Sequence, residues 1–162
     1  MKDIDSLFRS FVYAVKGFAW MVSHERNFRI HLVCLGYMIF FLCRYDFFVV
    51  SEIEASILVI ISALVIGSEM INTGIEKADD AFSREEKYAI KVSKDVAAGA
   101  VLVFAVASVV IGVFILWQPA AFEALFAHYK AHIWKVALLV FSFVLSLLFI
   151  FKFNFKEKGK EK

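Results

Sequence analysis

A stripe of polar side chains that continues a long apolar run most constrains how this chain can fold. Residues 55–68 are almost wholly apolar, and residues 69–80 follow directly with the sequence EMINTGIEKADD. At about 100° per residue in a helix, the polar side chains of the second segment fall within about 60° of one line; they are Glu69, Asn72, Thr73, Glu76 and Asp80. A carboxylate at the centre of a membrane helix costs about 2.5–3.5 kcal/mol, so it usually marks a functional site. The alternative is a stripe that only pairs with another helix for assembly.

The composition is typical of a small polytopic membrane protein. Hydrophobic residues make up 61% of the 162 residues, and charged blocks separate the apolar stretches. The chain has a single proline, Pro119, and no stretch rich in glycine and serine that would serve as a linker. We therefore expect one membrane domain without a second, soluble one.

The hydrophobic pattern predicts an all-α membrane protein with an N-terminal amphipathic surface helix and four transmembrane helices. Residues 3–24 place large apolar and aromatic side chains at helical spacing but are interrupted by Arg9 and Lys16, which suits a helix in the membrane interface. The predicted spans are residues 28–47, 52–80, 93–117 and 132–151. The remaining segments are a polar connection at 81–93, a short amphipathic connection at 120–131 and a basic, disordered tail after 151.

The distribution of basic residues predicts the orientation of these spans. Fifteen of the 18 lysines and arginines fall in residues 1–31, 77–94 and 152–162, which four spans place on one face of the membrane. Because basic residues accumulate on the cytoplasmic side, we expect both termini to be cytoplasmic and the protein to be a multi-pass protein of the cell membrane.

Several charged groups should then meet at the cytoplasmic boundary. Glu25, the lower part of the stripe, Lys94 and Asp95 share this depth, whereas Glu69 lies about 10 Å deeper than Glu76 at ~1.5 Å per residue. Mg²⁺ prefers oxygen ligands and usually takes one or two carboxylates with substrate phosphates. A lysine can offset phosphate charge, and a deeper carboxylate can act as general base on an alcohol. The pattern therefore favours a reaction between a membrane alcohol and an aqueous nucleotide.

Two motifs resemble the signature of the small prokaryotic diacylglycerol kinase/undecaprenol kinase family: EMINTGIEKADD at 69–80 and SKDVAAGAV at 93–101. The segments ERNFRIH at 25–31 and YAVKG at 13–17 are similar to its Gram-positive-type members, so the resemblance covers roughly residues 6–117. It implies an integral-membrane lipid kinase that forms a homotrimer. Each subunit would have three membrane helices and a surface helix, with active sites shared between neighbours and ATP–Mg²⁺ on the cytoplasmic side.

The resemblance also implies roles for individual residues. Glu69 matches the base that takes the proton of the lipid hydroxyl, and Glu25 and Glu76 match the carboxylates that hold Mg²⁺. The positions that match nucleotide-binding residues are Asn72, Asp80, Lys94 and Asp95, with Arg9 and Lys16 as basic positions of the surface helix.

The chain departs from the family chiefly in its fourth predicted span. Residues 1–118 correspond to the lipid kinase core, whereas 119–162 form an extra segment with the span 132–151 and the basic tail. This span could simply anchor the tail and fill lipid-facing surface, or it could alter substrate access or assembly.

Three functions remain to be weighed from the sequence. The NFRIH segment at 27–31 favours undecaprenol as the substrate of the kinase, with diacylglycerol as the alternative. A small ion or proton transporter would need ionisable residues across the whole membrane, but 96–117 has none. A structural assembly protein would not need Glu25, Lys94 and Asp95 at one depth. No nucleic-acid partner is expected.

Overall fold

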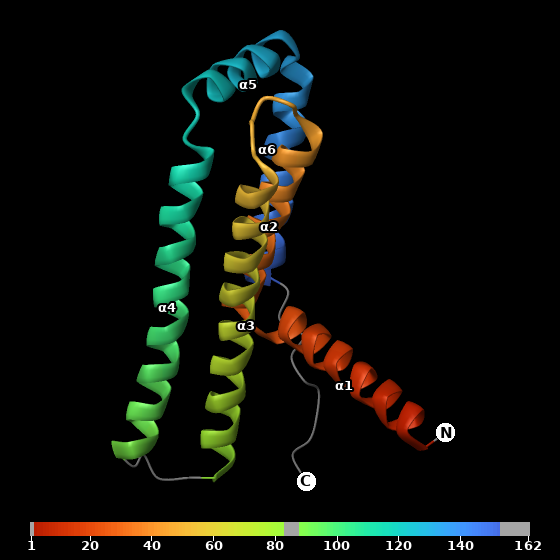
Figure 1. Cartoon of the computed structure of the whole chain (residues 1–162), viewed down its shortest axis with the longest axis vertical. Coiled ribbons are helices and arrows are strands. Elements are labelled where there is room, and N and C mark those ends of the chain that lie inside the picture. Colours follow the sequence, from red (N-terminus) through yellow and green to blue (C-terminus); the bar gives the residue numbers. More distant parts are fainter. Residues whose placement is uncertain (1, 83–87, 153–162) are drawn as a thin grey trace.

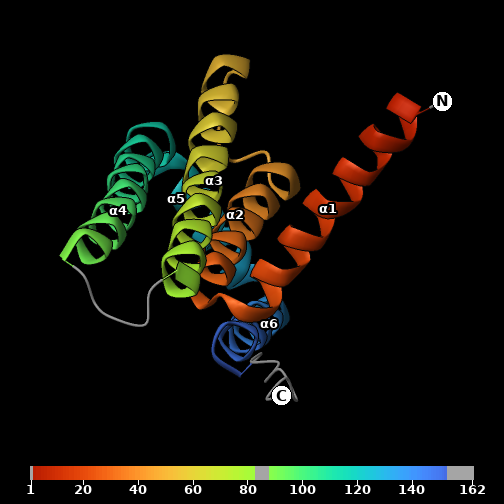
Figure 2. The same cartoon turned by 90° about the horizontal axis from the view of Figure 1, so that it is seen from below.

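The protein is a bundle of six helices in the computed structural model, which describes residues 2–82 and 88–152. The helices are α1 (Lys2–His24), α2 (Arg26–Arg44), α3 (Glu52–Phe82), α4 (Tyr88–Leu116), α5 (Pro119–Ala131) and α6 (Ile133–Lys152). No described residue belongs to a β-strand. Helices α2, α3, α4 and α6 run along the bundle, α5 crosses one end of it, and α1 leaves the other end at an angle (Figures 1 and 2).

Four of these helices are long and apolar enough to cross a membrane. They are Arg26–Arg44, Glu52–Ala81, Tyr88–Leu116 and Ile133–Phe151. The prediction of an all-α membrane protein with four spans is thereby confirmed. Helix α1 is amphipathic and diverges from the spans, and its large side chains Leu7, Phe8 and Phe11 are exposed, as suits a helix on a membrane surface.

Helix α3, which carries the polar stripe, begins at a capping box. The Ser51 hydroxyl accepts a hydrogen bond from the Glu54 backbone N–H at 3.3 Å, and the Glu54 carboxylate accepts one from the Ser51 backbone N–H at 2.8 Å. This reciprocal pair satisfies two of the backbone donors that a helix start leaves free. The helix then packs along α4, its principal neighbour, so the two form an antiparallel pair (Figure 2).

The corner between α1 and α2 is held by buried side chains. Phe28 is fully buried and meets Phe18 edge-on, with ring centroids 5.1 Å apart. The buried guanidinium of Arg29 donates to the backbone oxygens of Val22 and Ser23, which end α1. These contacts fix the position of Glu25, the residue between the two helices.

Two predicted boundaries are wrong. Helix α2 ends at Arg44 instead of 47, because Tyr45 adopts an extended backbone and turns its ring inward, where its hydroxyl lies 3.0 Å from that of Tyr129. Helix α4 begins at Tyr88 instead of 93, since residues 88–93 contain no proline or glycine that would break a helix. Of the predicted connection at 81–93, residues 83–87 lie outside the described part, as does the tail from 153 onward.

The C-terminal span is packed against the first one. The Tyr37 hydroxyl of α2 lies 2.9 Å from the Ser142 hydroxyl and 3.3 Å from the Ser146 hydroxyl of α6. Helix α5 leads into α6 from Pro119, which stands in the first turn where its missing N–H has no cost. The extra segment thus joins the bundle through α2 and lies away from the stripe of α3.

Candidate functional site

The polar stripe of α3 is largely buried in the structure. The exposed fractions are 3% for Glu69, 8% for Asn72 and 4% for Thr73, although all three lie within a candidate span. Glu76 is half-buried and Asp80 is exposed, so the stripe runs from the interior to the end of the helix. Burial at the deep end shields Glu69 from bulk water.

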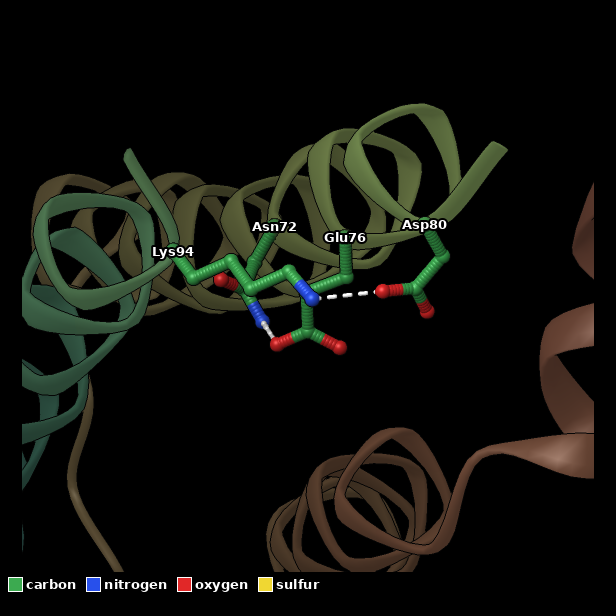
Figure 3. Close-up of polar contacts among 4 residues, drawn as sticks. All are labelled: Asn72, Glu76, Asp80 and Lys94. Atoms are coloured by element: carbon green, nitrogen blue, oxygen red, sulfur yellow. Dashed lines mark hydrogen bonds and ion pairs between the residues drawn. The ribbon is translucent and has the colours of Figure 1, made fainter. Parts of the chain in front are cut away.

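Asn72 and Glu76, one turn apart, are joined by a hydrogen bond. The Asn72 Nδ2 group donates to Glu76 Oε1 at 3.0 Å (Figure 3). Asn72 Oδ1 is buried, and no described group donates to it. A buried oxygen without a donor beside a carboxylate is a suitable pair of ligands for a hard cation such as Mg²⁺.

Lys94 reaches from the first turns of α4 to the lower end of the stripe. Its Nζ lies 2.5 Å from Asp80 Oδ1, and Figure 3 shows the lysine extending past Glu76 toward Asp80. The side chains are 35% and 59% exposed. Because ion pairs in solvent contribute little to stability, this lysine can exchange its carboxylate partner for a more highly charged one.

The corner before α2, which carries Glu25 and Asn27, approaches the stripe at Glu69 and therefore lies deeper than the sequence predicts for Glu25. The negative charges of Glu25 and Glu76 both act on the Glu69 carboxylate, and the Asn27 side chain forms a hydrogen bond with it. The sequence analysis gave Asn27 no role, although it lies in the ERNFRIH segment two residues after Glu25. Glu25 and Glu76 thus both lie close enough to Glu69 for their charges to act on it.

The other predicted site residues are not brought to this cluster within one chain. Asp95 is exposed on α4, and no described residue forms a hydrogen bond or ion pair with it. Arg9 and Lys16 lie on the exposed surface of α1, where the nearest recorded partner of Lys16 is the Tyr13 ring at 5.9 Å. Helix α1 leaves the bundle at an angle (Figure 1).

An apolar hollow of about 280 Å³ lies between the end of α1 and the stripe-bearing part of α3. Its lining comprises Gly17, Trp20, Met21, Met70, Thr73, Gly74 and Lys77. The Lys77 ammonium lies 5.3 Å from the centre of the Trp20 ring, which ties α3 to α1 beside the hollow. A hydrocarbon chain could therefore reach the neighbourhood of the stripe from the membrane side.

The oxygen groups of the site fit a metal that needs few protein ligands. In the described residues, no three His, Cys, Asp or Glu side chains are arranged as a metal site. A complete protein cage is therefore not formed there, but Mg²⁺ usually keeps waters and phosphate oxygens and takes only one or two carboxylates. Glu76, Asn72 Oδ1 and Glu25 could supply that smaller set.

Comparison with known proteins agrees with the chemistry of the site. A sequence model described as prokaryotic diacylglycerol kinase matches residues 12–116. The chain is 35% identical over 115 residues to the undecaprenol kinase of Bacillus subtilis, covering 70% of this chain and 89% of that protein. It is 33% identical over 115 residues to the diacylglycerol kinase of a Synechocystis species, covering 70% of this chain and 64% of that protein. No solved structure matches the chain significantly.

Proposed function

The chain belongs to the prokaryotic diacylglycerol kinase family and is a lipid kinase, and we propose that it transfers the γ-phosphoryl group of ATP to undecaprenol. The observation that carries this proposal is the arrangement of two glutamates on one face of α3, with Glu69 buried and Glu76 nearer the helix end. The NFRIH segment favours undecaprenol, and diacylglycerol is the alternative substrate.

The lower end of the stripe would bind the nucleotide. Glu76 with Asn72 Oδ1, and Glu25 from the corner before α2, would hold Mg²⁺, which would offset the negative charge of the phosphates when bound. Lys94 would turn from Asp80 toward the phosphates, since its exposed ion pair is weak. Asp80 and Asp95 would then border the nucleotide on the aqueous side.

The deep end would bind the alcohol. The prenyl chain would enter through the hollow beside α1, which brings its hydroxyl toward Glu69. Glu69 would take the hydroxyl proton while the oxygen attacks the γ-phosphorus, the bond to the bridging oxygen breaks, and ADP leaves with that electron pair. Asn27 would orient the carboxylate through its hydrogen bond.

We also propose a homotrimer with sites shared between neighbouring subunits, as the family resemblance implies. The exposure of Arg9 and Lys16 on α1 supports it, because no contact of either residue with the stripe of its own chain is formed in the described part and both could border the stripe of a neighbour. The apolar side chains exposed on α4, among them Val103, Val106 and Val110, could lie against another subunit or against lipid.

A lipid panel tests the proposed substrate. Purified protein is given γ-labelled ATP and Mg²⁺ with undecaprenol, diacylglycerol or ceramide in detergent micelles. We expect label in undecaprenol, with a kcat/KM at least about tenfold above that for diacylglycerol, within the range that chain recognition by an apolar site provides. Preferential labelling of diacylglycerol would show that diacylglycerol, not undecaprenol, is the substrate. If none of the three lipids were labelled, the proposal of a lipid alcohol as acceptor would be contradicted.

A reporter fused after Lys162 tests the orientation. Since fifteen of 18 basic residues lie on the side of the termini, both termini should be cytoplasmic. A reporter that is active only outside the cytoplasm should therefore be silent there, whereas the same reporter placed after Tyr129, in α5, should be active. Activity after Lys162 would exclude the proposed orientation.

A further inference from the structure

A second cavity, of about 580 Å³, lies between α2 and α6, toward the end of the bundle that α5 crosses. Its mouth is lined by Arg44, Tyr45, Tyr129, Trp134 and Lys135. Its deeper walls combine aliphatic and aromatic side chains with three hydroxyl groups; they comprise Val33, Gly36, Tyr37, Phe40, Leu138, Leu139, Ser142 and Ser146. Pockets that hold small ligands usually measure ~300–1,000 Å³, so this one has the size of a binding site. It lies far from the stripe, because its mouth is at the opposite end of α2 from Glu25.

The cavity is as long as one membrane leaflet is thick. On α2 its lining extends from Arg44 to Val33, and on α6 from Lys135 to Ser146, which is about 16 Å on each helix at ~1.5 Å per residue. The hydrocarbon core of a bilayer is ~30 Å thick. Tyrosine and tryptophan gather at the membrane interface, so the aromatic mouth lies at the level of the headgroups and the floor near the bilayer centre.

The mouth carries positive charge that no described carboxylate neutralises. Arg44 lies over the Tyr45 ring, 5.7 Å from its centre, and Lys135 Nζ lies 2.9 Å from His128 Nε2. Burial, and then the positive charges of Lys135, His132 and Arg44, lower the pKa of His128. Its neutral imidazole can therefore accept the lysine hydrogen bond but supplies no negative charge.

The deeper part offers an apolar path. The Tyr37 hydroxyl of α2 forms hydrogen bonds with the Ser142 and Ser146 hydroxyls of α6, and these bonds hold the two helices together without a ligand. A Cβ atom added to Gly36, which also lines the cavity, would meet no other atom within 4 Å. The wall at Gly36 is thus open enough for a hydrocarbon chain.

We propose that this cavity binds an anionic phospholipid of the leaflet opposite the kinase site, with its phosphate held by Arg44 and Lys135. A phosphate would form charge-assisted hydrogen bonds with both cations, and anionic lipids are attracted to basic groups at a membrane surface. The acyl chains would fill the space between α2 and α6. The lipid would thereby join the extra helix to the kinase core. A zwitterionic phospholipid would bring the same phosphate but add a cation of its own beside Arg44 and Lys135.

Quenching of Trp134 by lipids with brominated acyl chains tests this site. The full chain carries Trp20→Phe and Trp117→Phe, which leaves Trp134 as the reporter at the mouth. It is titrated in detergent micelles with brominated phosphatidylglycerol and, separately, with phosphatidylcholine of the same chains. We expect saturable quenching by phosphatidylglycerol at a concentration about tenfold or more below that for phosphatidylcholine, because both lipids carry the phosphate but the choline cation of the zwitterion is repelled by Arg44 and Lys135.

Three variants in the same background locate the lipid. Arg44→Gln with Lys135→Gln should abolish the preference, whereas Lys130→Gln, which removes an exposed charge of α5 that does not line the cavity, should keep it. Gly36→Phe should fill the cavity and weaken quenching by both lipids.

Equal quenching by the two lipids before any change to the cavity would overturn the proposal, and so would a preference that survives loss of both cations. Displacement of the brominated lipid by undecaprenol but not by unlabelled phosphatidylglycerol would instead assign the cavity to the substrate. Absence of saturable quenching by either lipid would also overturn the proposal. If a variant fails to fold, the comparison of the two lipids on the unaltered cavity still tests whether the cavity prefers the anionic lipid.

Discussion

Replacement of Glu69 by glutamine is expected to lower kcat by about 10²–10⁴-fold, the usual contribution of a general base. Glutamine keeps the shape of the side chain and its capacity for hydrogen bonds with Asn27, but it cannot take the proton of the lipid hydroxyl. The KM for ATP and the Mg²⁺ requirement should change little, because Glu69 lies about 10 Å from Glu76 along α3 at ~1.5 Å per residue. Steady-state titrations in ATP, Mg²⁺ and undecaprenol measure all three quantities.

Glu52→Gln provides the matched control for this experiment. It makes the same chemical change on the same helix, but Glu52 is exposed at the opposite end of α3. Its kinetic constants should equal those of the wild type. Normal turnover by Glu69→Gln would show that Glu69 is not the base, and Asp95 or Asp80 would be the next candidate.

Replacement of Glu76 by glutamine should instead raise the Mg²⁺ concentration needed for half-maximal activity and weaken ATP–Mg²⁺ binding. The change removes one negatively charged ligand of a cation that is held by few protein groups, and it converts the oxygen that accepts the Asn72 hydrogen bond into part of an amide. Loss of a group that orients a metal ligand commonly reduces metal affinity by about 10–100-fold, and we expect a loss of that order here. The kcat at saturating Mg²⁺ should fall less than in Glu69→Gln.

Asn72→Asp tests whether the negative charge of the metal site, rather than the position of one side chain, sets the Mg²⁺ affinity. It turns the unpartnered Asn72 Oδ1 into part of a carboxylate beside Glu76. In combination with Glu76→Gln it restores the number of negative charges, so it should recover part of the lost Mg²⁺ affinity. An unchanged Mg²⁺ dependence in Glu76→Gln alone would contradict the metal-binding role.

The stripe could be predicted from the sequence because it rests on local regularity. A helical repeat of 3.6 residues places Glu69, Asn72 and Glu76 on one face wherever the helix lies, and an apolar run before them makes that helix a span. The same reasoning found the surface helix and the four spans. The depth difference between the two glutamates follows from the helical rise alone.

The contacts between elements could not be predicted in this way. The hydroxyls of Tyr37 and Ser142 are paired although they are 105 residues apart in sequence, and nothing in the periodicity of either helix specifies the other. The pairing of Lys94 with Asp80 and the approach of Asn27 to Glu69 also depend on how α4 and α2 pack against α3. The cavity between α2 and α6 arises from such packing and left no signal in the sequence.

The start of α4 shows that the polarity of a segment is a poor guide to where a membrane helix begins. The sequence predicts a polar connection at 81–93, which includes residues 88–93. In the structure these residues are helical, since lysine favours helices and its charged end can lie at the interface while its stem packs on apolar surface. The polar residues at 88–93 therefore did not indicate where the helix α4 begins.

The central claim is that Glu69 serves proton transfer and Glu76 serves binding of Mg²⁺ and ATP. The most direct test measures bound nucleotide and transferred phosphoryl group in the same sample. Wild type, Glu69→Gln and Glu76→Gln are incubated with γ-labelled ATP, Mg²⁺ and undecaprenol; label retained on the protein and label in the extracted lipid are then counted. We expect Glu69→Gln to retain nucleotide but yield almost no labelled lipid, and Glu76→Gln to lose nucleotide at low Mg²⁺ yet label lipid when Mg²⁺ is raised. Loss of binding and transfer to the same extent in both variants would contradict the division of roles along α3.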